Sequence, residues 1–199
     1  MICLDGGRTT QLMRDPLGDS VRTPSRLIIE RAHSSALTAT KADAVRRLCD
    51  AAYGTNTTPF FASLGPGEHL LGILNGVLVS HLMWVTRWLQ PQNHSLLRTA
   101  YIEMVATAPA HQRRGHASAL LEHAVPLLRE FDLAALCPAT EGLYARLGWQ
   151  FWRGPLFARR EGSVVPTPEE RVMVLALQRT PALDLDLPLS VEWRPGEVW

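Results

Sequence analysis

The residues best suited to chemistry lie between positions 103 and 117. Glu103 belongs to an apolar run, Pro109 turns the chain, and Gly115 opens an amphipathic helix. The first amides of a helix have no partners inside it, and together with the helix dipole they bind phosphate oxygens. Gly115 has no Cβ to block a diphosphate, and Arg113 and Arg114 add positive charge. The segment therefore predicts a diphosphate site; the alternative is an ordinary helix start with a solvated arginine pair.

Two motifs in this order resemble a known family. Gln112–Ala117 (QRRGHA) looks like the Q/R-x-x-G-x-G/A acyl-coenzyme A signature of the GNAT N-acetyltransferases, and Leu143–Trp149 (LYARLGW) resembles that family's tyrosine motif. Tyr101–Glu103 and above all Glu192–Trp199 (EWRPGEVW) are similar to the aminoglycoside 2′-N-acetyltransferases, which end in a matching Asp-Trp-Arg-x-Gly-Asp-Val-Trp. The resemblance covers roughly residues 26–199. It implies acetyl transfer from acetyl-coenzyme A to an amino group of an aminoglycoside.

By the same resemblance, the cofactor lies along the edge of the strand that carries Glu103 and over the turn into the helix. Pantetheine would pair with this edge as an added strand does, and the Val105 N–H would donate to the thioester oxygen. Such oxyanion stabilisation typically contributes ~3 kcal/mol. The residues implied to bind acetyl-coenzyme A are Met104, Val105, Thr107, Gln112, Arg113, Arg114, Gly115, His116 and Ala117.

Glu103 is the candidate general base. An alkylamine with a pKa of about 10.4 is under about 0.1% neutral at pH 7, so a group that removes its proton assists attack on a thioester. Glu103 is expected to share a buried strand face with Thr99, Tyr101 and Val105, where an unpaired carboxylate is costly. The resemblance implies that Glu103 acts through a water; the alternative is a structural carboxylate paired to an arginine.

Tyr144 is the candidate acid for the departing coenzyme A thiolate. An ordinary tyrosine pKa of about 10 lies above about 8.5 for a thiol, so the hydroxyl keeps a proton to donate. The alternative is a packed aromatic ring with a satisfied hydroxyl.

The acceptor pocket is expected to be acidic, because aminoglycosides are polycations. The candidate anions are Glu103, Glu169, Glu170, Glu197 and the terminal carboxylate of Trp199. For Glu169 and Glu170 the alternative is an acidic, solvated surface. The related enzymes carry an aspartate in the loop after the first helix, whereas Gly54–Thr58 contains no acid. This departure suggests a narrower or less cationic acceptor, such as kasugamycin, an aminoglycoside with a carboxylate of its own.

Hydrophobic periodicity supplies the elements that would position these residues. Apolar residues at i, i+4 and i+7 predict a helix over 40–53, and Asn75-Gly76 joins the runs 68–74 and 77–89 in a predicted type I′ hairpin. Residues 97–107 are apolar on both faces and predict a central strand. The other predicted elements are strands at 26–30, 133–136, 149–153 and 171–177, a polar loop at 55–59, helices at 113–131 (kinked or shortened by Pro126) and 140–147, and a half-exposed strand from Leu183 to Leu189.

This order of elements predicts an α/β chain with a single central mixed sheet flanked by helices, a GNAT-like acyltransferase fold. The acetyltransferase domain is expected over 25–199, after a flexible N-terminal extension at 1–24.

Composition narrows the class of protein. The chain has 199 residues and a formal charge of +1, which suits one well-buried core and removes the electrostatic case for nucleic-acid binding. We expect a cytoplasmic enzyme with no membrane partner, because no apolar run approaches about 20 residues and Met1–Ser20 lacks a signal-peptide core. No metal is expected, since ligand spacing is lacking among Cys3, Cys49, Cys137, His111, His116 and His123.

Two other functions compete with aminoglycoside acetylation. One is the same chemistry on a protein N-terminus, a lysine or a polyamine; Glu197 and Trp199 favour the antibiotic. The other is a non-catalytic acyl-coenzyme A-binding module, against which Glu103 and Tyr144 argue. A homodimer is the prior expectation, because many relatives are dimers.

Overall fold

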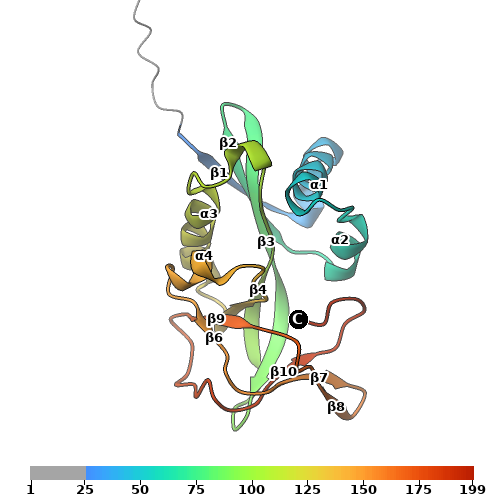
Figure 1. Cartoon of the computed structure of the whole chain (residues 1–199), viewed down its shortest axis with the longest axis vertical. Helices are drawn as coiled ribbons and strands as arrows, with labels where there is room; N and C mark the ends of the chain where they lie inside the picture. The colour runs from blue at the N-terminus through green and yellow to red at the C-terminus, as the bar shows by residue number, and fades with distance from the viewer. Residues whose placement is uncertain (1–25) are drawn as a thin grey trace, which may run out of the picture.

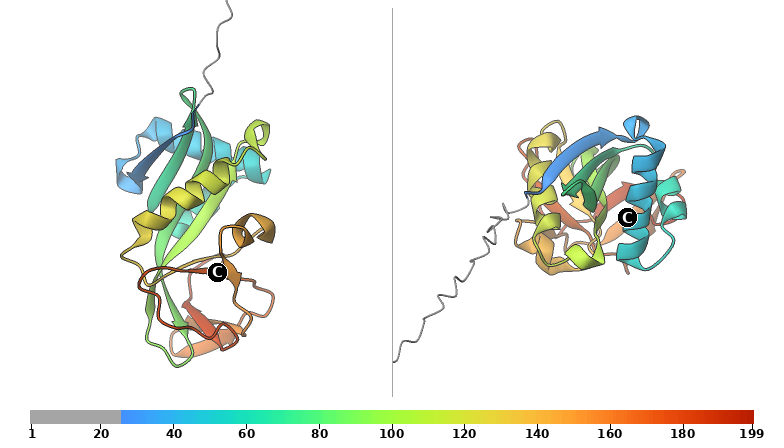
Figure 2. Two further views of the ribbon diagram at one scale, coloured as in Figure 1. Left: turned by 90° about the vertical axis from the view of Figure 1, so that its left-hand side faces the viewer. Right: turned by 90° about the horizontal axis from the view of Figure 1, so that it is seen from above.

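The computed structural model describes residues 26–199, and the extension predicted at 1–24 lies outside them. The described residues form a ten-stranded mixed sheet with helices on both faces (Figures 1 and 2). The main path of the sheet runs β6-β9-β5-β4-β3-β10-β7-β8, and β1 joins through β2. The strands are β1 (Ile28–His33), β2 (Glu68–Leu74), β3 (Val77–Pro91), β4 (Leu97–Thr107), β5 (Leu133–Leu136), β6 (Gln150–Phe151), β7 (Leu156–Arg160), β8 (Ser163–Pro166), β9 (Met173–Ala176) and β10 (Leu189–Glu192). The helices are α1 (Ala39–Tyr53), α2 (Thr58–Leu64), α3 (His116–Ala124) and α4 (Glu141–Ala145), with short 3₁₀ turns η1 (Ser34–Ala36), η2 (Pro109–His111) and η3 (Val125–Leu128).

The long strands β3 and β4 form the spine of the sheet (Figure 1). β3 pairs antiparallel with β4 on one side, and on the other it pairs first with β2 and then with β10. The β2–β3 turn has positive φ at Asn75 (52°) and Gly76 (77°), which confirms the predicted hairpin. The predicted central position of 97–107 is also confirmed, because β4 lies between β3 and β5.

The sheet opens between β4 and β5. These strands pair in parallel only where Thr99–Tyr101 faces Leu133–Ala135. Beyond that point, β4 has no partner on this side among the described residues, although it continues to Thr107. An edge of β4 is therefore left open in the middle of the molecule.

A bulge in β4 lies just beyond this opening. The register between β3 and β4 shifts, so that Met83 faces Glu103 but His81 faces Ala106, and Met104 has a positive φ of 53°. An extra residue of this kind reverses the side-chain alternation that follows it. The prediction that Val105 shares a face with Tyr101 was therefore wrong: Tyr101 packs in one core cluster and Val105 against the other.

Helices cover the two faces of the sheet (Figure 2). α1 contributes Leu48 and Cys49 to the cluster that also contains Tyr101. α3 contributes Leu120 and Leu121 to the cluster on the opposite face. α1 and α3 therefore pack in different core clusters, on opposite faces of the sheet.

Prolines explain two differences from the predicted elements. The helix predicted at 113–131 is limited to α3, because Pro126 falls in the 3₁₀ turn η3, where its missing N–H removes no α-helical hydrogen bond. The loop predicted at 55–59 is wrong at its end, because α2 begins at Thr58. Pro59 is tolerated in the first turn of α2, where N–H groups have no helical partner.

The strand predicted from Leu183 to Leu189 is also wrong. Regular pairing begins only at Leu189, after Pro188, and the preceding segment is an irregular turn. Leu183 and Leu185 pack against the core, whereas Asp186 forms an exposed ion pair with Arg153. The alternation of leucine and aspartate thus reflects a packed loop rather than a pleated strand. The strands β7 and β8 were not predicted.

Candidate active site

A cavity of about 490 Å³ lies where β4 and β5 separate. It brings Glu103, Val105, Tyr144, Glu197 and Trp199 together from β4, α4 and the C-terminal tail. Its other walls are Tyr53, Thr55, Asn56, Thr57, Phe60, Ile102, Met104, Ala117, Leu136, Cys137, Pro138, Ala139, Thr140 and Leu143. Two cavities of about 700 Å³ lie elsewhere, and neither is lined by the candidate base or the candidate acid.

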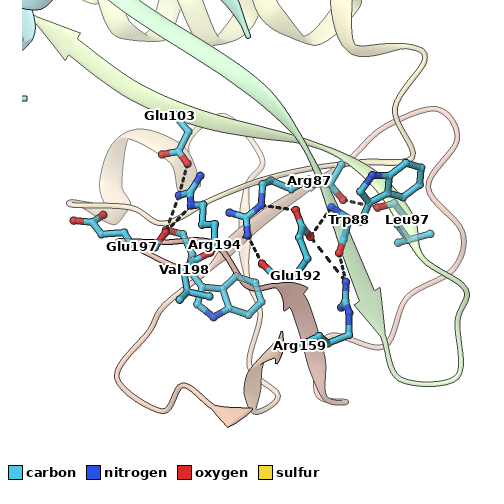
Figure 3. A network of polar contacts seen from close by, with 11 residues as sticks. Arg87, Trp88, Leu97, Glu103, Arg159, Glu192, Arg194, Glu197 and Val198 are labelled. Atoms are coloured by element: carbon cyan, nitrogen blue, oxygen red, sulfur yellow. Dashed lines mark hydrogen bonds and ion pairs between the residues drawn. The ribbon is translucent and has the colours of Figure 1, made fainter. Parts of the chain in front are cut away.

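Glu103 lies in this cavity with only 8% of its surface exposed. Its Oε1 accepts a hydrogen bond of 2.7 Å from Nη2 of Arg194 (Figure 3). Burial raises the pKa of Glu103 to about 7, although Arg194 opposes the rise. The arginine pairing named as the alternative is therefore present, and the pKa still lies where a general base operates near neutral pH.

Arg194 also fixes the tail that carries it. Its Nε donates to the carbonyl oxygen of Glu197 at 2.5 Å, and its Nη2 lies 3.3 Å from the main-chain oxygen of Trp199. Trp199 is 2% exposed, and its indole Nε1 donates to Oγ1 of Thr167 at 2.8 Å. One guanidinium thus connects the candidate base to the last turn of the tail.

Another arginine, Arg87 on β3, is buried and holds the tail from the side of the sheet (Figure 3). Its Nε donates to Oε1 of Glu192 at 2.6 Å, and its Nη2 donates to the carbonyl oxygens of Glu192 at 2.6 Å and Val198 at 3.0 Å. Both arginines approach the Tyr101 ring, at 5.4 Å and 5.9 Å from its centroid. The tail is therefore held in place by hydrogen bonds from both arginines, and it forms one wall of the cavity.

Tyr144 faces the cavity from α4 and is 8% exposed. Burial raises the pKa of its hydroxyl to about 12, and the charge of Cys137, which also lines the cavity, adds to the rise. Trp149 packs edge-on against the Tyr144 ring at 6.1 Å. The Tyr144 ring is therefore packed, as the alternative interpretation expected. Its hydroxyl nevertheless keeps its proton throughout the neutral pH range.

The Gln112–Ala117 turn leads into α3 beside the cavity. Arg113 and Gly115 have positive φ, 60° and 80°, and Gly115 is the N-cap of α3. No side chain in the described part of the chain caps this helix, and no other residue lies within 4 Å of the place where a Gly115 Cβ would stand. The first amides of α3 are therefore accessible to a diphosphate.

Only some of the acidic residues predicted for the acceptor pocket line the cavity. Glu197 lines the cavity, whereas Glu169 and Glu170 are not among its walls. Glu170 lines a neighbouring cavity, with its Oε2 3.8 Å from Sγ of Cys137. After α1, the wall is made of neutral side chains, Thr55, Asn56 and Thr57.

Two residues that contact the site were not predicted from the sequence to do so. Arg194 lies inside the EWRPGEVW motif, so its presence was visible, but nothing in the motif shows that it reaches Glu103. Tyr53, the last residue of α1, donates from its hydroxyl to the Val105 carbonyl oxygen at 3.0 Å. Tyr53 is 45% exposed, and no sequence signal shows that its hydroxyl contacts β4.

The mixed sheet that opens between β4 and β5 is the fold of the GNAT acetyltransferase class. Residues 33–152 match the family described as "Acetyltransferase (GNAT) domain", and the chain belongs to this family. Over 145 residues it is 30% identical to the aminoglycoside 2′-N-acetyltransferase of Mycolicibacterium fortuitum. The aligned region covers 66% of this chain and 74% of that protein.

Solved structures share the fold at low identity. The GNAT family N-acetyltransferase YhbS from Escherichia coli, solved in complex with CoA, has a TM-score of 0.59 and 16% identity over 85% of this chain and 91% of that one. Eis1 from Mycobacterium abscessus has a TM-score of 0.53 and 18% identity over 64% of this chain. The chain spans only 32% of the length of Eis1. Among the described residues, no helix is long and apolar enough to cross a membrane.

Proposed function

We infer that this acetyltransferase moves an acetyl group from acetyl-coenzyme A to an amino group of an aminoglycoside. The observation that carries the proposal is the folding of the EWRPGEVW tail against Glu103, through Arg194, within one cavity. The 30% identity to an aminoglycoside 2′-N-acetyltransferase supports the same acceptor class.

The residues of the cleft fit acetyl-coenzyme A as the co-substrate. The uncapped first turn of α3 and the open space at Gly115 would hold the diphosphate, with Arg113 and Arg114 beside it. Pantetheine would extend along the unpaired edge of β4 to Val105. The acetyl group would then lie in the cavity with Glu103 and Tyr144.

In the proposed reaction the amine nitrogen attacks the thioester carbonyl carbon, and the carbon–sulfur bond breaks. Glu103 removes the proton of the amine through a water, and its pKa of about 7 suits that task at neutral pH. The Val105 N–H donates to the oxygen on which negative charge develops. Tyr144 gives its proton to the departing thiolate and regains one from solvent, because its pKa of about 12 keeps it protonated at rest.

The charges of the cavity favour a cationic acceptor of limited charge. Glu103 and Glu197 are acidic, but Arg194 neutralises part of their field, and the wall after α1 offers Asn56 rather than an acid. An aminoglycoside with few amines, such as kasugamycin, therefore suits the cavity better than a drug with many.

A thiol-release assay tests the proposal. Pure protein and acetyl-coenzyme A are combined with kasugamycin, gentamicin, kanamycin, spermidine or an amine-terminated peptide. We expect release with an aminoglycoside at a kcat/KM at least tenfold above that with polyamine or peptide. A higher kcat/KM with a peptide, a lysine or a polyamine would show that the acceptor is not an aminoglycoside. Coenzyme A binding without release for any amine would indicate a binding module.

A further inference from the structure

A row of hydrogen-bonded side chains connects η1 to the bulge in β4. The Ser34 hydroxyl lies 2.9 Å from Nε2 of His69, and Nδ1 of His69 lies 2.9 Å from Nε2 of His81. Nδ1 of His81 then lies 2.9 Å from the carbonyl oxygen of Met104. Cys49 contacts the same nitrogen from α1 at 3.8 Å. The row connects η1 at the edge of the sheet to the residue before Val105.

The Met104 carbonyl determines the direction of both hydrogen bonds that His81 makes. A carbonyl oxygen can only accept, so Nδ1 of His81 carries a hydrogen and its Nε2 accepts from His69. Nε2 of His69 is then the unprotonated nitrogen of its ring, and the single hydroxyl proton of Ser34 is shared between this nitrogen and the Gly67 carbonyl oxygen, which lies 3.0 Å from Ser34 Oγ. His81 is 0% exposed and His69 is 4% exposed. Burial lowers the pKa of His81 to about 3 and that of His69 to about 4, so both rings stay neutral in the working range and keep this order of donors.

The end of the row fixes a particular peptide plane. The Met104 carbonyl and the Val105 N–H belong to the same trans peptide, so they point in opposite directions. The His81 ring, which also contacts Cys49 of α1, draws the carbonyl toward itself. The N–H of Val105 is thereby directed away from the His81 ring, and Val105 itself lines the cavity at the opening between β4 and β5. The hydroxyl of Tyr53 holds the following carbonyl, that of Val105.

We propose that His81, supported by His69 and Ser34, is a positioning residue that aims the Val105 N–H at the thioester oxygen. This proposal rests on the proposed acetyl transfer. Met104 has a positive φ, a conformation that a side chain larger than glycine adopts only where its surroundings hold it. The hydrogen bond from His81 supplies such a restraint. Because His69 donates to His81 and His81 donates to Met104, the first of these bonds also polarises the second, by about 10–30%.

Two substitutions at position 81 test the two hydrogen bonds of the His81 ring separately. In His81→Asn, the amide nitrogen replaces Nδ1 and can donate to Met104, but contact with His69 is lost. In His81→Gln, the longer amide reaches His69 in place of Nε2, but the bond to Met104 is lost. Both variants are polar and cost similar amounts of packing, which makes them matched controls.

We expect His81→Gln to lower kcat about tenfold or more, with the acetyl-coenzyme A Kd from calorimetry within threefold of wild type. His81→Asn should keep kcat within about threefold. Equal kcat in the two variants, or a lower kcat in the Asn variant, would overturn the proposal. If the Gln variant does not fold, the Asn variant decides alone, and a loss of tenfold or more there counts against the proposal.

A second readout does not depend on turnover. In backbone amide NMR spectra without substrate, the Val105 resonance should shift in His81→Gln more than in His81→Asn, and more than that of Thr99 on the same strand. An unshifted Val105 resonance would contradict the positioning role. If the wild-type chain releases no thiol with any amine but the His81→Gln variant shows the Val105 shift, the acetyl transfer is refuted and the geometry of the row stands.

Discussion

At the residue scale, Glu103 combines two interpretations that the sequence set against each other. It is ion-paired to Arg194, as a structural carboxylate would be, and burial still raises its pKa to about 7. Sequence alone could predict the buried carboxylate, because Glu103 interrupts an apolar strand. It could not predict the partner, since Arg194 lies 91 residues away and is brought near only by the folded tail.

Glu103→Gln tests the base directly. The amide keeps the shape of the side chain but cannot take a proton, so kcat should fall at least tenfold. The Kd of acetyl-coenzyme A, measured by calorimetry, should hold. Unchanged turnover would leave Glu103 with a structural role alone.

Arg194→Met tests the electrostatic link. The positive charge of Arg194 favours the ionised form of Glu103, so its removal raises the pKa of that carboxyl. The acid limb of the kcat profile at saturating acceptor should lie near pH 7 in the wild-type protein and move upward by about one pH unit in Arg194→Met. Arg194→Lys retains the charge and should leave the limb near its original place. An acid limb that does not move in the Met variant would separate Arg194 from the base.

At the scale of elements, the sequence predicts best where a local rule decides the structure. The Asn75-Gly76 turn, α1 and β4 follow from turn chemistry and periodicity, and each lies close to its predicted bounds. The bulge at Met104 has no such local signal, because its positive φ is stabilised by contacts from β3. β7 and β8 are short strands that depend on pairing with β10 and with each other.

Gly115→Ala tests the cofactor turn. A methyl group at a φ of 80° is strained and stands where a diphosphate would approach, so the acetyl-coenzyme A Kd should rise about tenfold. Gly76→Ala is the matched control, because Gly76 has a φ of 77°, equally open surroundings and a place in the β2–β3 turn. It should lose similar stability and bind acetyl-coenzyme A normally. An equal loss of affinity in both variants would indicate a general effect of destabilisation.

Extension of the chain past Trp199 tests the tail. Trp199 lines the cavity and its main-chain oxygen is held by Arg194, so added residues would crowd the acceptor. A short C-terminal tag should raise the KM for the aminoglycoside several-fold and leave the KM for acetyl-coenzyme A unchanged. The same tag at the N-terminus serves as the control. If both tagged proteins show the wild-type KM, the tail does not contact the acceptor.

At the scale of the whole molecule, function follows from an interrupted sheet. β4 lies at its centre, yet β5 leaves it after three paired residues, and the cavity fills the opening. The predicted single mixed sheet flanked by helices is confirmed, and the three predicted helices occur in the predicted order, with the unpredicted α2 between the first two. The opening itself could not be predicted, because strand divergence depends on packing between distant segments.

The central claim is that this cleft holds acetyl-coenzyme A beside Glu103. Calorimetric titration of the folded wild-type chain with acetyl-coenzyme A tests it most directly. The account predicts saturable binding at one site per chain, weakened in Gly115→Ala and retained in Glu103→Gln. Absence of binding heat over a range of temperatures, for both coenzyme A and its acetyl thioester, would contradict it.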